Sequence, residues 1–259
     1  MDILLYIISG AAVGLAIGVT GVGGGSLMTP LLIMMGFPYH IAIGTDLLYA
    51  AVTKAGGVVA HQKQKSIHWN TVFAMAAGSV PAALLTSFLL NRIFNGVDEY
   101  EQLLTTSLGV MLMLTALVLI FKNKLQSPLT TTEPSPRVKR RAVVLTFAMG
   151  IFLGVFVTLT SVGAGALGTA ILMVLYPRFT ALKIVGTDIA HAVPLTFIAG
   201  MGHYIFLGNV DFVLLACLLV GSLPAVRFGT KLGAQLPSTV LRPILATILM
   251  GLGVKFALF

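Results

Sequence analysis

The sequence has little charge and almost no cysteine. Only 9% of its 259 residues are Asp, Glu, Lys or Arg, whereas 57% are hydrophobic, and the mean hydropathy is +1.00. A soluble domain carries about 25% charged residues, so this chain could not solvate a globular surface. Cys217 is the only cysteine, which excludes an intrachain disulfide and a cysteine-rich metal centre. The composition predicts an all-α integral membrane protein in a lipid bilayer.

Enzyme motifs are also lacking. The chain has no Walker loop, no His-Glu-x-x-His, no Gly-x-Ser-x-Gly and no dinucleotide fingerprint in a βαβ setting. The glycine-rich run 21–25 is flanked by apolar segments typical of membrane helices, which argues against a nucleotide loop. We therefore expect a protein that is not an enzyme and that has no cofactor and no bound metal.

Acidic residues are scarce relative to basic ones. The chain has 16 Lys and Arg against 8 Asp and Glu, a formal net charge of +8. No basic stripe is interleaved with aromatic residues, so we expect no nucleic-acid partner. In membrane proteins, basic residues gather in cytoplasmic loops, and the excess is a signal of topology. The N-terminus, Met1-Asp2, enters an apolar run without a basic segment, which predicts a retained first span.

Long apolar runs make up most of the chain, and two of them end in glycine-rich breaks. The breaks are Gly21-Val22-Gly23-Gly24-Gly25 and Ser161-Val162-Gly163-Ala164-Gly165. A helix cannot be sustained through so many permissive residues, and a short apolar segment follows each break. The expected segments are 3–20, 26–36, 41–60, 71–90, 103–121, 142–160, 166–176, 184–204, 211–228 and 239–257. These runs predict 8–10 transmembrane segments, depending on whether the short ones cross.

The landmarks repeat along the chain at a nearly constant offset. Thr20 and Thr160 differ by 140 positions, and Asp46 and Asp188 differ by 142. A Gly-Ser-x-Pro-Ala element at 78–82 recurs 143 positions later. The sequence thus predicts two homologous transmembrane repeats, 1–121 and 142–259, joined by a basic linker, 122–141, that we expect to be solvated and cytoplasmic.

The positive-inside rule favours an inverted repeat. If each short segment crosses, each half has five crossings, and 14 basic residues lie inside against 2 outside. If the short segments are re-entrant, each half has four crossings, the halves are parallel, and the ratio is 10 to 6. We therefore expect ten crossings in a five-plus-five inverted repeat with both termini outside, and the re-entrant arrangement stays open.

The two breaks are candidates for a transport site. Inverted repeats with short, glycine-interrupted segments at corresponding positions are typical of transporter binding sites, where helix N-termini attract anions. The alternative is that the glycines only permit close helix packing. The guanidinium of Arg227, which replaces Leu84 of the first half, is a candidate partner for a substrate oxyanion. The candidate substrate-binding residues are Thr20, Gly23, Gly24, Gly25, Ser26, Thr160, Ser161, Gly163, Gly165 and Arg227.

Polar residues inside the apolar spans are candidates for coupling or gating. Asp46 and Asp188 each follow a Gly-Thr pair near the start of a span, which we expect to interrupt the helix there. An intramembrane carboxylate suggests function, such as titration with a coupled proton, although capping of a broken helix is the alternative. Lys54 is expected to snorkel toward the inner surface. The candidate coupling or gating residues are Thr45, Asp46, Tyr49, Thr187, Asp188, His191 and His203, the last of which alternatively lies at an interface.

These paired motifs resemble the sulfite exporter TauE/SafE family. The resemblance rests on both breaks, on Gly44-Thr45 and on Val185-Gly186-Thr187-Asp188, and it covers nearly the whole chain. It implies a permease of the prokaryotic inner membrane for sulfite, thiosulfate or organosulfonates. We expect export by alternating access, with proton coupling as a candidate and a homo-oligomer left open. The second break departs from a triple glycine through Ala164, which predicts unequal half-sites.

Two other functions are considered. A divalent-cation permease would use Asp46, Asp188, His191 and His203 as ligands. A membrane-embedded enzyme or assembly subunit would show no flux from the purified protein alone.

Overall fold

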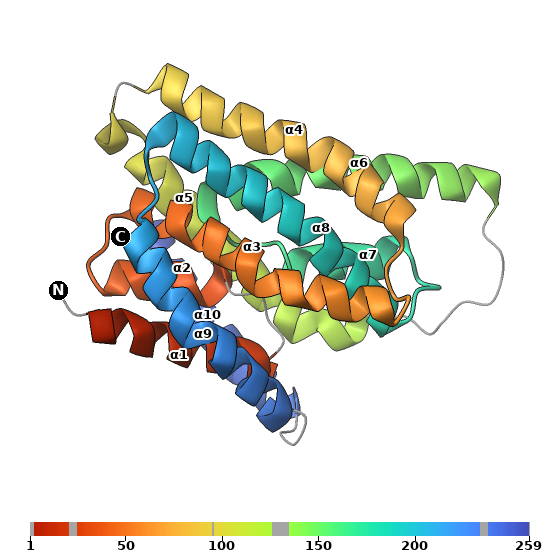
Figure 1. The fold of residues 1–259 in the computed structure, drawn as a ribbon. Helices are drawn as coiled ribbons and strands as arrows, with labels where there is room; N and C mark the ends of the chain where they lie inside the picture. The colour runs from red at the N-terminus through yellow and green to blue at the C-terminus, as the bar shows by residue number, and fades with distance from the viewer. Residues whose placement is uncertain (1–2, 21–24, 95, 126–134, 234–237, 259) are drawn as a thin grey trace.

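A computed structural model describes residues 3–20, 25–94, 96–125, 135–233 and 238–258 (Figure 1). Within these ranges the chain is helical and contains no strand. In the first half the helices are α1 (Ile3–Thr20), α2 (Gly25–Met34), α3 (Tyr39–Lys63), α4 (Trp69–Ile93) and α5 (Val97–Leu125). In the second half they are α6 (Pro136–Thr160), α7 (Ala166–Leu175), α8 (Ala181–Gly202), the π-helical turn η1 (His203–Leu207), α9 (Phe212–Gly233) and α10 (Ser238–Leu258).

The helices have the length and composition of a multi-pass membrane protein. Six of those described can span a bilayer on these criteria, namely Ile3–Thr20, Trp69–Ile93, Glu99–Phe121, Arg140–Thr160, Ala181–Leu207 and Phe212–Leu232. Large apolar side chains such as Phe73, Val213 and Phe228 are more than 60% exposed, as expected of surfaces that face lipid. The all-α membrane class predicted from composition is confirmed. Helices α2 and α7 have 10 residues each, about 15 Å, and are too short to span alone.

Helices of one half pack against helices of the other. Helix α1 packs along α9, and α6, its counterpart in the second half, packs along α4; α3 packs on α8, and α5 on α10. Glycines permit these close approaches: a Cβ on Gly14 would lie 2.7 Å from the Cα of Ser222, and a Cβ on Gly154 would lie 2.8 Å from the Cα of Ser79. These contacts are the same ones repeated at offsets of 140 and 143, with the halves exchanged.

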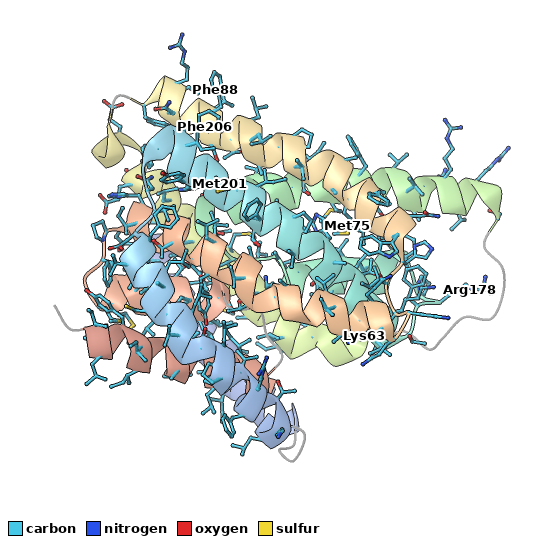
Figure 2. All side chains as sticks on the ribbon, viewed as in Figure 1. Lys63, Met75, Phe88, Arg178, Met201 and Phe206 are labelled. Atoms are coloured by element: carbon cyan, nitrogen blue, oxygen red, sulfur yellow. The ribbon has the colours of Figure 1, made fainter. Side chains whose placement is uncertain are left out.

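Helices α3 and α8 run antiparallel at the middle of the molecule. Near the start of α3, a Cβ on Gly44 would overlap the carbonyl oxygen of Asn209, which follows α8. Near the start of α8, a Cβ on Gly186 would lie 2.8 Å from the carbonyl oxygen of Ser66, which follows α3. In Figure 2, Lys63 and Arg178 accordingly lie at the same end of the molecule, and Phe88 and Phe206 lie toward the other end.

Two expectations about local structure need revision. Helix α3 runs without interruption through Gly44-Thr45-Asp46, and α8 runs through Gly186-Thr187-Asp188. The glycines there serve close contact with the opposite half and do not break the helix. The expected linker 122–141 is also partly helical, because α5 continues to Leu125 and α6 begins at Pro136.

Candidate functional site

The second break is held by a single threonine and by two glycines with positive φ. Helix α6 ends at Thr160, and Ser161 follows in the left-handed region at φ 58°. Gly163 and Gly165 have φ of 112° and 138°, which side chains rarely tolerate, so glycine is required at both positions. The Thr160 hydroxyl donates to the Phe156 carbonyl at 2.6 Å and accepts from the Val162 amide at 3.1 Å. These bonds engage the hydroxyl in shaping the break.

The start of α2, which follows the first break in the sequence, packs on the second break. Of the first motif, Gly23 and Gly24 lie outside the described residues, and Gly25 begins α2. A Cβ on Gly25 would overlap the carbonyl oxygen of Ser161, so the first turn of α2 packs directly on the second break. The Thr20 hydroxyl donates to the Ala16 carbonyl at 2.7 Å within its own helix. The short helix of the first half and the break of the second half are thus in direct contact.

A small cavity lies between the start of α2 and the second break. Its free volume is about 10 Å³, room for about one water molecule, so an oxyanion does not fit in this conformation. The hydroxyl of Thr115, a residue only 1% exposed, has no hydrogen-bond partner among the described residues, whereas the Ser161 side chain interacts with the Asp46 carboxylate. Buried polar groups are normally paired, so the Thr115 donor is available to a ligand. The described lining residues are Gly25, Ser26, Thr115, Ser161, Gly163, Ala164 and Ala166.

Two buried carboxylates lie beside the short helices. Asp46 of α3 accepts a hydrogen bond from the Thr29 hydroxyl of α2 at 2.5 Å and interacts electrostatically with Lys54. Asp188 of α8 faces α7, where a Cβ on Gly168 would overlap one of its oxygens. Neither carboxylate caps its own helix, because the helices begin seven residues earlier at Tyr39 and Ala181. The capping alternative does not describe these residues.

The residue one turn after each carboxylate points toward a serine of the other half. The Nε2 atom of His191 lies 2.8 Å from the Ser79 hydroxyl on α4. At the corresponding position of the first half is Tyr49, which is fully buried. The Tyr49 hydroxyl interacts with the side chain of Ser222, the counterpart of Ser79. The two half-sites share a serine partner and differ in the residue that faces it, His191 in one and Tyr49 in the other.

Lys54 belongs to this site, which the sequence did not indicate. Its ammonium does not extend to a surface: it donates to the carbonyl of Ala164, a residue of the cavity lining, at 2.8 Å. It interacts electrostatically with Asp188 and Asp46. The signal in the sequence was its position two helical turns after Asp46, which places both on one face of α3. Thr29 and Thr115 were also missed, because a lone threonine in an apolar span is commonplace.

Further predicted residues lie at the ends of the α3–α8 pair. Thr45 accepts a hydrogen bond from the Asp211 amide at 3.0 Å, and Thr187 accepts one from the His68 amide at 3.0 Å. The buried ring of His203 donates from Nε2 to the Thr158 carbonyl at 2.8 Å, so His203 lies in the interior and not at an interface.

Two predicted roles do not agree with where the structure places the residues: Arg227 as a substrate ligand, and the four-residue set of a metal site. Arg227 is exposed on α9 and is not among the described residues lining the cavity. Among the described residues, no group of three or more His, Cys, Asp or Glu could hold a metal ion. That search includes Asp46, Asp188, His191 and His203, the set required for a cation permease.

Apolar helices, a short helix packed on a glycine-rich break and buried charges beside them define a multi-pass membrane protein with a central polar site. A family model described as "Sulfite exporter TauE/SafE" matches residues 6–256, and the chain belongs to this family. It is similar to the "Probable membrane transporter protein YjnA" of Bacillus subtilis (strain 168), with 39% identity over 251 residues that cover 96% of this chain and 97% of the relative.

More distant relatives carry similar names. The "Probable membrane transporter protein YdhB" of Bacillus subtilis (strain 168) is 28% identical over 92% of this chain and 94% of its own length. The "Probable membrane transporter protein MJ0441" of Methanocaldococcus jannaschii is 25% identical over 96% of this chain and 93% of its own length. No solved structure matches the chain. The family and these relatives make the chain a membrane transporter.

Proposed function

We propose that the protein is a secondary transporter that exports a small sulfur-containing anion, such as sulfite, thiosulfate or an organosulfonate, across the prokaryotic inner membrane. The observation that carries this proposal is the cavity between the start of α2 and the second break, lined by the unpaired hydroxyl of Thr115 and by the Ser161 hydroxyl beside Asp46. The first turns of α2 and α7 end at the same cavity. Helix N-termini and hydroxyl donors suit an oxyanion. The sulfur chemistry and the direction are taken from the family's description.

We propose that the two halves, 1–121 and 142–259, form an inverted repeat that works by alternating access. The antiparallel arrangement of α3 and α8, which are counterparts in the repeat, supports this proposal. The reciprocal packing of α1 on α9 and of α6 on α4 supports it as well. Repeats of this kind can exchange conformations around a central site, and the site then opens to each side in turn. The end with Lys63 and Arg178 is assigned to the cytoplasm by the positive-inside rule.

Binding by the purified full-length chain tests the substrate. We expect thiosulfate, sulfite or a sulfonate to raise the melting temperature, because a ligand of the folded state stabilises it. Thr115→Val removes one cavity hydroxyl at constant shape and should weaken affinity about 10-fold or more, the value of a hydrogen bond to a charged group. The matched control is Thr105→Val on the same helix, whose hydroxyl bonds to the Glu101 carbonyl at 2.7 Å.

Three outcomes would contradict the proposal. One is stabilisation by a divalent metal and by none of the anions. Another is equal anion affinity in Thr115→Val and the wild type. The third is flux of the bound anion in proteoliposomes no faster than through protein-free vesicles.

A further inference from the structure

The repeat carries a cation on one side only. Lys54 of α3 lies at an offset of 142 from Thr196 of α8, and the Thr196 hydroxyl bonds to the Ala192 carbonyl of its own helix at 2.9 Å. The Lys54 ammonium instead reaches the second break of the opposite half, at the Ala164 carbonyl. Ala164 lies in the cavity lining, so the ammonium is next to the space that a ligand would enter.

We propose that Lys54 is the cationic ligand of the transported anion, and that Asp46 and Asp188 balance its charge while the site is empty. This inference rests on the proposed function, because it names the charge that a transported anion would meet. An ammonium has three donors, and the Ala164 carbonyl uses one of them. The flexible four-carbon stem lets the ammonium turn from this carbonyl toward an anion in the widened cavity.

The charges around Lys54 predict that anion binding is accompanied by proton uptake. The groups that interact electrostatically with Lys54 are Asp46 on its own helix and Asp188 and His191 on α8. With one carboxylate ionised, the other protonated and the imidazole neutral, the cluster has no net charge, so an added anion would leave it negative. Buried charges are tolerated only when compensated, so an arriving anion brings a proton with it, which one of the carboxylates accepts. Binding of a monoanion therefore takes up about one proton.

The test is calorimetric titration of the full-length protein with thiosulfate and with methanesulfonate near neutral pH, where neither ligand changes its own charge. Titrations are run in imidazole and in bis-tris buffers, which contain no sulfonate and differ in ionisation enthalpy. The wild type should take up about one proton with methanesulfonate, a monoanion, and more with thiosulfate, a dianion. Lys54→Met should lose at least tenfold in affinity, the order expected when a charged hydrogen-bonding partner is removed. The control Lys63→Met, at the end of α3, should bind like the wild type.

A double variant separates anion binding from a purely structural charge balance. Lys54→Met/Asp188→Asn removes one charge of each sign, so it restores the balance even if Lys54→Met alone does not fold. If Lys54 contacts the anion, the double variant folds, as judged by its melting temperature, yet binds weakly. If the double variant binds with wild-type affinity, or if Lys54→Met does, the inference is overturned while the proposed function stands. If the wild type binds neither anion nor sulfite, the proposed function fails and the inference fails with it.

Discussion

The Thr45 hydroxyl accepts a hydrogen bond from the backbone N–H of Asp211 at 3.0 Å, which ties the start of α3 to the segment before α9. The same bond occurs at the other end of the α3–α8 pair, where Thr187 accepts from the His68 amide at 3.0 Å. Each half thus closes one end of the central helix pair through a threonine of its Gly-Thr-Asp motif. In the proposed transport cycle, opening to one side requires the bond at that end to break.

Replacing either threonine by valine should loosen one end only. Thr187→Val leaves the backbone N–H of His68 without its hydrogen-bond acceptor, and Thr45→Val leaves the backbone N–H of Asp211 without its acceptor. Each change should lower the stability of the folded protein by about 1–3 kcal/mol. Hydrogen exchange followed by mass spectrometry should speed up in residues 66–72 for Thr187→Val and in residues 209–215 for Thr45→Val. The serine variants, which keep the acceptor, are the controls. Equal acceleration at both ends in either valine variant would refute independent closure.

Gly168→Ala should be poorly tolerated. Its Cβ would overlap a carboxylate oxygen of Asp188, and the short helix α7 would have to move away from α8. Overpacking of this kind costs about 1–3 kcal/mol and should lower both the melting temperature and anion binding. Gly56→Ala on α3 is the matched control, because nothing lies within 4 Å of its Cβ position. Equal melting temperatures for the two variants would argue against the close contact.

The serines that face His191 and Tyr49 should both contribute to stability. Ser79→Ala removes a hydrogen bond to buried His191 and should cost about 1 kcal/mol or more in stability. Ser222→Ala removes the hydroxyl that interacts with buried Tyr49 and should cost a similar amount. Thermal unfolding without ligand measures both. An unchanged melting temperature for either variant would contradict the contact that it removes.

Stability should fall on acidification through His68. Its ring lies 4.9 Å from that of Phe179, and burial lowers its pKa, an effect that the nearby Lys183 ammonium strengthens. The unfolded chain takes up this proton at about pH 6.5, whereas the folded chain resists it. Between these two pKa values the unfolded state binds more protons, so stability decreases as pH falls below about 6.5. His68→Gln should flatten that part of the profile of melting temperature against pH, and an unchanged slope would contradict the assignment.

Much of the fold could be predicted from local patterns in the sequence. The length of the apolar runs and the glycine runs that follow them predict the ends of α1 and α6. Both signals are local in the sequence and do not depend on how the helices pack against one another. The constant offset between Thr20 and Thr160 predicts counterpart helices in two repeats, and the charge asymmetry among the loops favours an inverted arrangement of these repeats; both stay predictions.

The parts that escaped prediction depend on contacts between the halves. Gly44 and Gly186 look like helix breakers, yet each is a contact point for a carbonyl group of the opposite half. Lys54 looks like a snorkelling lysine because its acceptor, the Ala164 carbonyl, lies 110 positions away. Every residue has a backbone carbonyl, so no sequence pattern predicts which carbonyl will accept a hydrogen bond from a distant side chain. Arg227 shows the converse: a change of residue between the repeats suggested a role in the site, and its side chain faces outward.

The pairing of Lys54 with Thr196 means that two nearly interchangeable backbones carry unlike electrostatics. In the proposed cycle, exchanging the conformations of the halves would yield states of equal free energy if the side chains were identical. In that proposed cycle, a cation on α3 and a hydroxyl on α8 would give the protein a preferred resting orientation and unequal barriers for the two directions of turnover. The driving gradient still fixes the direction of net flux, while the position of one ammonium group biases how fast each half of the cycle proceeds.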